Sequence, residues 1–378
     1  MPSLYDLKKD ELFELDEDAF WFMNECASAE GCRVEGIDRD FLHFCLSEGI
    51  LTAEKYFRKP TPPPLKSPVP SLRYLELQIT DRCNLKCRHC FVGDSQNNEI
   101  SVVTVRKILD EFIQMQGLRV MITGGEPLMH RDFKQINDML PDYGCRKVLF
   151  TNGLLLNRQI MKNLNFDEIQ FSIDGMERGH DALRGKGTFR IVIRQMEDAV
   201  KLGIPSSVAT IVHSRNLDEF DKMRELFKNI GIKDWTVDIP SPAGNLRNNL
   251  SFLVPPDAAG KYLNYGFGEN YHGSTEGFAC GLHLCSILAN GIIAKCAFYS
   301  GTPIGHIKEG LRVAWQRLNP IKLEELECFD ISCPVINLCR GGCRYRASAS
   351  SEAGGNNYKK DIYKCYAYGI IKAGHEAR

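Results

Sequence analysis

The chain has 378 residues, of which 43% are hydrophobic and 25% charged, and its 47 basic and 48 acidic residues give a formal net charge of −1. This composition excludes a disordered chain, and the balanced charge excludes a strongly basic nucleic-acid binder. The unusual number is the count of 15 cysteines. Such a density indicates either a disulfide framework in a secreted protein or metal ligation inside the cell.

The first residues of the sequence decide between these explanations. They are acidic and mixed, without the basic segment and apolar run of a signal peptide. No apolar run is long enough to span a membrane. We therefore expect a cytoplasmic protein without a membrane or nucleic-acid partner, in which most cysteines are free thiols or metal ligands.

Proline marks the first boundary in the chain. Residues 59–70 contain six prolines and predict a stiff, extended linker. In the preceding piece, 1–58, we expect two short strands within 3–15 and then two helices, the first after the acidic turn 15–18 and the second over 38–47. Cys26 and Cys45 share helical faces with aromatic residues, so both are expected in the core of this piece.

Strands and helices alternate after the linker. Strands are expected at 74–80, 118–123, 146–151, 168–173, 206–212 and 234–239, with helices at 101–116, 132–140, 157–164, 188–202 and 216–230. This alternation predicts an α/β fold with a parallel sheet and right-handed crossovers. Six units instead of eight predict a partial TIM-like barrel over 71–268, with ligands at the C-terminal ends of the strands. Cys145, at the start of a strand, is expected in the core.

The segment 269–378 has a different character. Regular periodicity fades, apart from a hairpin-like stretch around Gly291, and eight of the cysteines lie here. They are Cys280, Cys285, Cys296, Cys328, Cys333, Cys339, Cys343 and Cys365. A region with so few apolar runs is expected to depend on ligation for its fold. Eight thiols match two four-cysteine iron–sulfur clusters, and two zinc sites are the alternative.

Three further cysteines directly follow the first strand of the barrel. Cys83, Cys87 and Cys90 have the spacing C-x3-C-x2-C. Three thiolates on one short loop can ligate three irons of a cubane and leave the fourth iron open for chemistry. A zinc site, which normally has four closing ligands, is the alternative.

Polar motifs stand at the ends of other strands. The second strand ends in Gly124, Gly125 and Glu126, where two glycines would let a ligand approach the backbone and the carboxylate could accept hydrogen bonds from a cationic amine. The fourth strand ends in Ser172 and Asp174, whose side chains suit ribose hydroxyls. Because parallel strands end at one edge of the sheet, these motifs predict a common binding site.

With these motifs, residues 74–240 resemble the radical S-adenosylmethionine (SAM) superfamily. The resemblance implies that Cys83, Cys87 and Cys90 hold a 4Fe–4S cluster, to which SAM binds through its amino and carboxylate groups. It also implies reductive cleavage of SAM to methionine and a 5′-deoxyadenosyl radical, which abstracts hydrogen from a C–H bond. The chain would then be a radical SAM oxidoreductase.

The same resemblance implies roles for the polar residues around SAM. Glu126 would bind the amino group, and Arg184 would bind the carboxylate. Ser172 and Asp174 would lie near the ribose. His89 stands where the family often has an aromatic residue, and it would pack against adenine.

Segment 269–378 resembles the SPASM domain, the auxiliary-cluster extension of radical SAM peptide-modifying enzymes. Gly291-x4-Cys296 and Cys339-x3-Cys343 fit its pattern, whereas Cys328-x4-Cys333 is two residues longer than usual. The resemblance implies two auxiliary 4Fe–4S clusters, so the chain would carry three clusters in all. One would be held by Cys280, Cys285, Cys296 and Cys343, and the other by Cys328, Cys333, Cys339 and Cys365.

Residues 15–51 resemble a PqqD-like peptide-recognition element, which implies a small α+β domain that binds a precursor's leader peptide as an added strand. A structural cap on the barrel is the alternative. We thus expect a maturase that cross-links or otherwise oxidises a ribosomally synthesised peptide, with a thioether, ether or carbon–carbon bond as the possible link. A low-potential ferredoxin or flavodoxin would supply the electrons.

Two other functions stay open at this point. The first is formylglycine formation or small-molecule oxidation, although Ala297 replaces the acidic general base that sulfatase-maturing relatives carry after the cysteine. The second is a non-catalytic iron–sulfur scaffold, which would have no use for the Gly-Gly-Glu-Pro motif. No catalytic base can be named from the sequence.

Overall fold

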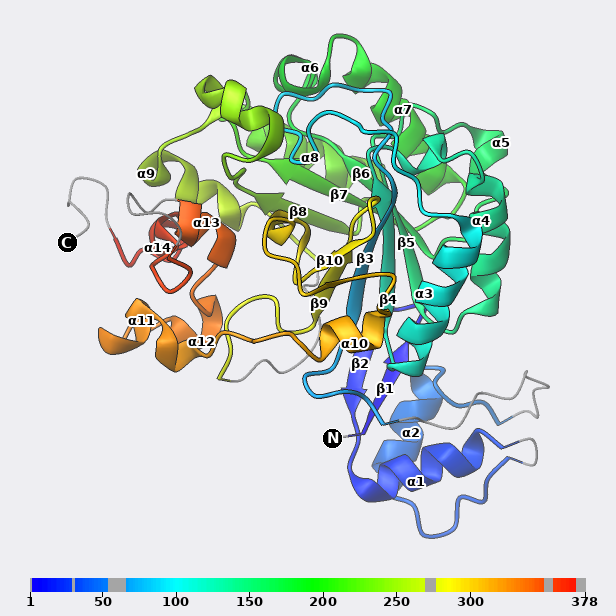
Figure 1. Cartoon of the computed structure of the whole chain (residues 1–378). Helices are drawn as coiled ribbons and strands as arrows, with labels where there is room; N and C mark the ends of the chain where they lie inside the picture. The colour runs from blue at the N-terminus through cyan, green and yellow to red at the C-terminus, as the bar shows by residue number, and fades with distance from the viewer. Residues whose placement is uncertain (1, 29–30, 54–65, 269–276, 350–355, 372–378) are drawn as a thin grey trace. The chain divides into compact units, whose positions relative to one another are not determined.

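A computed structural model describes residues 2–28, 31–53, 66–268, 277–349 and 356–371 (Figure 1). The chain divides into two compact units, with Met1–Lys66 in the first and Ser67–Asn270 and Ser274–Arg378 in the second. Of the expected linker 59–70, residues 59–65 lie outside the described residues.

The first unit is a hairpin followed by two helices. Strands β1 (Ser3–Asp6) and β2 (Glu11–Glu14) pair antiparallel, and helices α1 (Glu17–Cys26) and α2 (Arg39–Ser47) follow. Asp16 caps α1 by accepting a hydrogen bond from the Ala19 amide, and Asp38 caps α2 in the same manner. The expected order of two strands and two helices is confirmed.

The cysteines of this unit correct one expectation. Cys45 is buried, as predicted, but Cys26 is bonded to Cys32 in a disulfide. Cys26 is the last residue of α1, and the chain turns back so that the two Cα atoms are 4.5 Å apart, within the range that a disulfide spans. Helical periodicity places Cys26 on an aromatic face, but it cannot predict that the chain turns back and brings Cys32 next to it.

A nine-stranded sheet organises the second unit, in the order β11-β10-β9-β3-β4-β5-β6-β7-β8. The strands are β3 (Tyr74–Thr80), β4 (Arg119–Gly124), β5 (Arg146–Thr151), β6 (Glu168–Ser172), β7 (Ser206–Ile211), β8 (Asp234–Asp238), β9 (Leu284–Ile287), β10 (Ile292–Ala294) and β11 (Gly305–His306). Neighbouring strands from β9 to β8 run parallel, and β10 and β11 are antiparallel. The predicted α/β fold, a partial TIM-like barrel of six units, is confirmed.

The helices follow the expected alternation. In the barrel they are α3 (Val102–Gln114), α4 (Phe133–Met139), α5 (Arg158–Met161), α6 (Glu177–Arg184), α7 (Thr188–Lys201) and α8 (Phe220–Ile230). Beyond it lie α9 (Pro256–Ala259), α10 (Leu311–Trp315), α11 (Glu327–Asp330), α12 (Ile336–Cys339), α13 (Arg344–Ala349) and α14 (Ile362–Ala367). Helix α6 was not expected, and α5 is shorter than the predicted helix 157–164.

The main hydrophobic core lies between the sheet and these helices. Ser101 caps α3, whose buried residues Val105, Ile108 and Leu109 recur at helical spacing and belong to one apolar cluster with Leu77 of β3. A second cluster joins β6, β7 and β8 to α7 and α8. Alternate residues of each strand therefore face the helices, and the others face the inside of the barrel.

Segment 269–378 takes part in the same sheet. β9 pairs in parallel with β3, where Glu76 lies opposite Ser286, and Gly291, at φ +86°, stands in the turn between β9 and β10. The hairpin expected around Gly291 is thus confirmed. We did not predict that this hairpin joins the barrel sheet, because β9 has only four residues and shows too little periodicity to be recognised as a strand.

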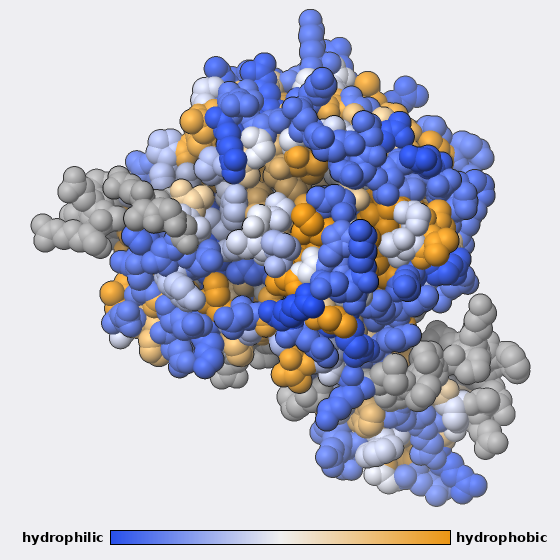
Figure 2. Space-filling view, viewed as in Figure 1, coloured by the Kyte–Doolittle hydropathy of each residue, from blue (hydrophilic) through white to orange (hydrophobic). Residues whose placement is uncertain are grey.

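Apolar side chains are mostly internal in this unit. Figure 2 shows a largely hydrophilic surface in which apolar residues form small, separate areas. None of the helices within the described ranges is long and apolar enough to cross a membrane.

Trp235 tests the packing of the second core. It is 1% exposed, its Nε1 donates to Thr210 Oγ1 at 2.8 Å, and its ring packs against Phe220 and Phe227. We expect Trp235→Ala to lower the free energy of unfolding of the second unit by about 3–5 kcal/mol. Denaturant titration followed by circular dichroism measures this loss. Trp21→Ala, at a residue 68% exposed in the first unit, is the control and should leave that transition unchanged; equal effects would contradict the packing described.

Candidate functional site

The loop after β3 brings the three cysteines of the C-x3-C-x2-C motif together. Cys87 is buried, and the other two are half-buried. Burial raises the pKa of the Cys87 thiol to about 11, the positive charge of Arg184 opposes this, and Cys90 and Cys83 raise it further. The Asn245 side chain donates to the Cys87 carbonyl at 3.1 Å, and its amide donates to the Cys90 carbonyl at 2.9 Å. The loop is therefore anchored at the C-terminal edge of the sheet.

The two glycines after β4 lie against this loop. The Gly125 amide donates to the Thr80 carbonyl at 2.8 Å, and a Cβ at Gly124 would lie 2.1 Å from the same oxygen. A Cβ at Gly125 would lie 2.3 Å from the Arg82 carbonyl oxygen. These glycines thus let the end of β4 lie close to the chain's own cysteine loop. From the sequence we had expected them to let a ligand approach.

Glu126 lies fully buried at the same edge. Its carboxyl group accepts hydrogen bonds from the Thr151 hydroxyl at 2.9 Å and from the amides of Asn152 and Leu128 at 2.9 and 3.3 Å. Burial raises the pKa of Glu126 to about 7 even though these bonds lower it. No cation is paired with it within the described residues, so the geometry suits an incoming ammonium group.

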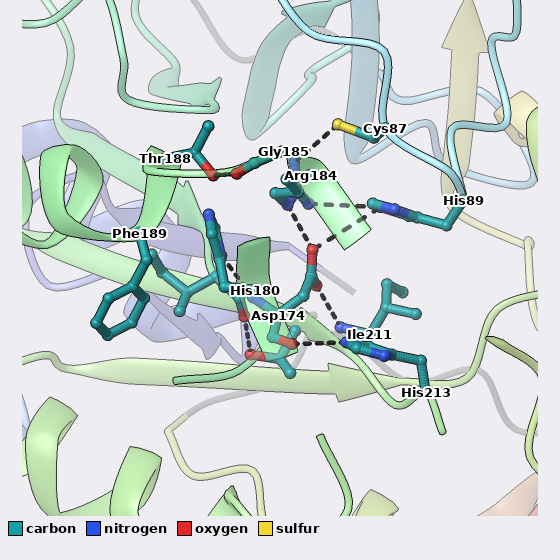
Figure 3. Close-up of polar contacts among 12 residues, drawn as sticks. Cys87, His89, Asp174, His180, Arg184, Gly185, Thr188, Phe189, Ile211 and His213 are labelled. Carbon is teal, nitrogen blue, oxygen red and sulfur yellow. Dashed lines mark hydrogen bonds and ion pairs between the residues drawn. The ribbon is translucent and has the colours of Figure 1, made fainter. Parts of the chain in front are cut away.

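Asp174 and Arg184 form a buried ion pair next to the cysteine loop (Figure 3). The other Asp174 oxygen accepts from the Ile211 amide at 2.8 Å. Arg184 also reaches the loop, with Nη1 4.0 Å from the Cys87 sulfur and Nη2 3.5 Å from His89 Nε2. Burial by itself would raise the pKa of Asp174, but the charges of Arg184 and His89 hold it well below its usual range.

His89 lies inside this group. Burial lowers the pKa of His89 to about 4, so its ring is neutral near pH 7. Its Nδ1 is buried and has no hydrogen-bond partner among the described residues. Ser172 is half-buried at the end of β6, and no hydrogen bond joins it to this group within the part of the chain described. The structure thus brings together all the residues that we predicted to bind SAM, except Ser172. Some of them contact one another directly, and the others are joined by the cysteine loop.

Several supporting residues were not predicted. His213 Nε2 lies 2.8 Å from the Asp174 carbonyl oxygen, to which the Asn216 side chain also donates at 3.0 Å. The Asp174 amide donates to His180 Nδ1 at 3.2 Å. These contacts fix the backbone that carries the carboxylate. His213 could have been found, because it directly follows an expected strand, as the other motifs do.

The residues present fit an iron–sulfur cluster and SAM. No three His, Cys, Asp or Glu side chains within the described ranges converge as a mononuclear metal site requires. Three thiols spaced around a short loop instead suit separate irons of one cluster, with the open iron left for a ligand. The unsatisfied His89 Nδ1 and the cation-free Glu126 offer polar contacts to such a ligand.

The C-terminal cysteines fall into two groups. Cys328, Cys333, Cys339 and Cys365 line one hollow together with Asp361 and Lys364. Cys280 and Cys343 raise the pKa of Cys296, Cys280 raises that of Cys343, and Cys296 raises that of Cys285, so these four thiols lie near one another. Burial is the main cause of the raised pKa in Cys296, Cys343 and Cys285. The hollow thus brings together the four cysteines of one set that the resemblance implies, and the assignment of both sets to clusters stays a prediction.

Residues 77–227 match the Radical SAM superfamily. This match assigns residues 77–227 to a radical SAM domain, a domain that in its family binds a 4Fe–4S cluster and SAM. The match runs from within β3 to within α8 and includes Cys83, Glu126 and Arg184.

Known proteins similar to this chain differ in what they act on. The AdoMet-dependent heme synthase of Methanosarcina barkeri is 26% identical over 346 residues, 79% of this chain and 97% of that relative. The mycofactocin maturase MftC of Mycolicibacterium smegmatis is 29% identical over 164 residues, 42% of each chain. Streptococcus suis SuiB, solved with its precursor peptide SuiA, covers 95% of both chains with a TM-score of 0.68 and 14% identity, which shows a shared fold. The PqqD-like assignment of 1–58 stays a prediction.

Glu126 gives a pH test of the empty site. Its folded pKa of about 7 lies above the value of roughly 4.3 of an unfolded glutamate, so its contribution to stability is present below pH 4 and is lost as the pH rises to 7. Without SAM, the melting temperature of the wild type should fall between pH 5 and 8. In Glu126→Gln this fall should be smaller. Glu324→Gln, at an exposed position, should leave the slope as in the wild type. Parallel curves for wild type and Glu126→Gln would contradict the burial described.

Proposed function

We propose that this enzyme is a maturase that oxidatively modifies, and most simply cross-links, a ribosomally synthesised peptide. The observation that carries the proposal is the pair of four-cysteine groups in the same compact unit as the radical SAM site. An oxidation that removes hydrogen from a substrate releases a surplus electron, and two auxiliary clusters would provide its acceptor. The relationship to MftC and the fold shared with SuiB support a peptide as the substrate.

The site residues take the roles that the family pattern implies. Cys83, Cys87 and Cys90 would hold the cluster, and Glu126 would bind the SAM amino group. Arg184 would bind the SAM carboxylate. Its guanidinium is already oriented by Asp174 and directed at Cys87, so it would need little rearrangement.

The adenosine part of SAM would meet the other polar residues. Ser172 and Asp174 would lie near the ribose, and His89 near adenine. Because His89 is neutral and retains a free Nδ1, it can offer either a stacking face or a hydrogen-bond acceptor.

When bound, the cluster and SAM supply a 5′-deoxyadenosyl radical and methionine from one external electron. The substrate then loses two hydrogens for each bond formed. One hydrogen atom would go to 5′-deoxyadenosine, and the second would leave as a proton. The two four-cysteine groups would hold the auxiliary clusters that accept the remaining electron. The buried walls of the barrel orient the substrate and exclude water.

Partners follow from this scheme. The first electron would come from a low-potential ferredoxin or flavodoxin. The precursor peptide would carry a leader, and the first unit would bind it. No nucleic-acid partner is proposed, in keeping with the balanced charge.

Oxidation of a tetrapyrrole is the second candidate. It is favoured by the alignment with a heme synthase over 97% of that relative. Formylglycine formation is less supported, because Ala297, buried directly after Cys296, provides no proton acceptor.

Product analysis tests the proposed reaction. The full chain, reconstituted without oxygen, is incubated with SAM, dithionite and a candidate precursor peptide encoded beside the gene. We expect 5′-deoxyadenosine and a peptide lighter by two hydrogens per bond in intact-mass spectra. Cys87→Ala should give neither product. An unchanged peptide beside oxidation of an added iron tetrapyrrole in a parallel reaction would favour the second candidate instead.

Iron content tests the number of clusters. Three 4Fe–4S clusters predict about twelve irons per chain, whereas a single SAM cluster predicts about four. Cys339→Ala should lower the content by about four, because it removes one ligand of one auxiliary site. Cys145→Ala is the control, since Cys145 is buried in the apolar core of the barrel and belongs to neither proposed ligand set. A wild-type content of about four would contradict the auxiliary clusters.

A further inference from the structure

Arg344 is a fully buried arginine at the start of α13, directly after Cys343. Its Nη1 donates to the carbonyl oxygens of Asn357 and Lys359 at 3.0 and 2.8 Å. Its Nη2 is buried and has no hydrogen-bond partner among the described residues. Gly341 packs directly on the guanidinium, since a Cβ there would lie 2.9 Å from Nη2. The side chain is therefore held in place, with one donor left over.

The charge of Arg344 is not balanced by a carboxylate. Within the described residues it forms no ion pair, although it is always charged in proteins. Arg346, on the same helix, shows the contrast, because its Nη2 lies 2.7 Å from Asp361 and its Nη1 lies 2.8 Å from Asp238. An unpaired buried cation is costly, so Arg344 calls for an anion that the described side chains do not supply.

Arg344 lies beside both cysteine groups. Gly341, which packs on its guanidinium, lines the same hollow as Cys328, Cys333, Cys339 and Cys365. Arg344 also directly follows Cys343 of the other group in the chain.

We propose that Arg344 is the fixed counter-charge of the auxiliary clusters, above all of the one held by Cys328, Cys333, Cys339 and Cys365, and that it raises the reduction potential of that cluster. A thiolate-ligated cluster is anionic, and reduction adds a further negative charge. A cation buried beside it stabilises the reduced form more than the oxidised form, because the local dielectric constant is low. The free Nη2 supplies a hydrogen bond to the cluster as well. Arg344 is thus a positioning residue for the electron acceptor, and this inference rests on the proposed auxiliary clusters.

Redox titration of the reconstituted full chain, followed by electron paramagnetic resonance, tests the proposal. Arg344→Gln removes the charge and is expected to lower the midpoint potential of one auxiliary cluster. Arg344→Lys keeps the charge and should show a smaller shift. Arg317→Gln is the control, because Arg317 is an exposed arginine paired with Glu309 at 2.9 Å, and it should behave as the wild type. The signal that responds to added SAM should keep its midpoint in all four proteins.

Iron analysis of the same samples separates a structural role from an electrostatic one. A loss of about four irons in Arg344→Gln but not in Arg344→Lys would support the counter-charge, because only the uncharged variant loses a cluster. Equal losses in both variants, or a full iron content with unchanged midpoints, would overturn the proposal. A wild-type protein with about four irons would instead refute the auxiliary clusters, which is a different result.

Discussion

The parallel sheet is the constraint on which the candidate site depends. Because β3, β4 and β6 run in the same direction, the cysteine loop, Glu126 and Asp174 all emerge at one edge of the sheet. Contacts between these segments then fix the details. Gly124 and Gly125 let the end of β4 lie against the loop that follows β3, and Arg184 joins Asp174 to Cys87. The direction of the strands thus places these segments at one edge of the sheet, and the contacts between them then fix their positions.

Charge is distributed differently in the two parts of the second unit. At the candidate SAM site, the cation Arg184 is neutralised by Asp174, and Glu126 forms no ion pair within the described residues. Around the C-terminal cysteines the situation is reversed, because Arg344 forms no ion pair with any described carboxylate. A zwitterionic ligand with an ammonium group suits the first site, and anionic clusters suit the second. The two unbalanced charges therefore point to different partners.

Sequence patterns predicted the parts of this structure that local periodicity and spacing control. Six barrel strands were located to within a residue or two, whereas the division of the C-terminal cysteines into two sets of four came from the family resemblance. What failed depends on contacts between distant segments. Strand β9 is only four residues long and is defined by its pairing with β3, and Cys26 is paired through a return of the chain. Likewise, Gly124 and Gly125 are needed because the backbone of Thr80 and Arg82 lies against them, and no local sequence pattern predicts this contact.

Transfer of a label from substrate to cofactor tests the central claim most directly. The candidate peptide, deuterated at its carbon-bound positions, is incubated with SAM, dithionite and the reconstituted enzyme, and 5′-deoxyadenosine is analysed by mass spectrometry. The account predicts deuterium in the 5′-deoxyadenosine in proportion to the modified peptide. Unlabelled 5′-deoxyadenosine, formed alongside a modified peptide that keeps all its deuterium, would contradict it.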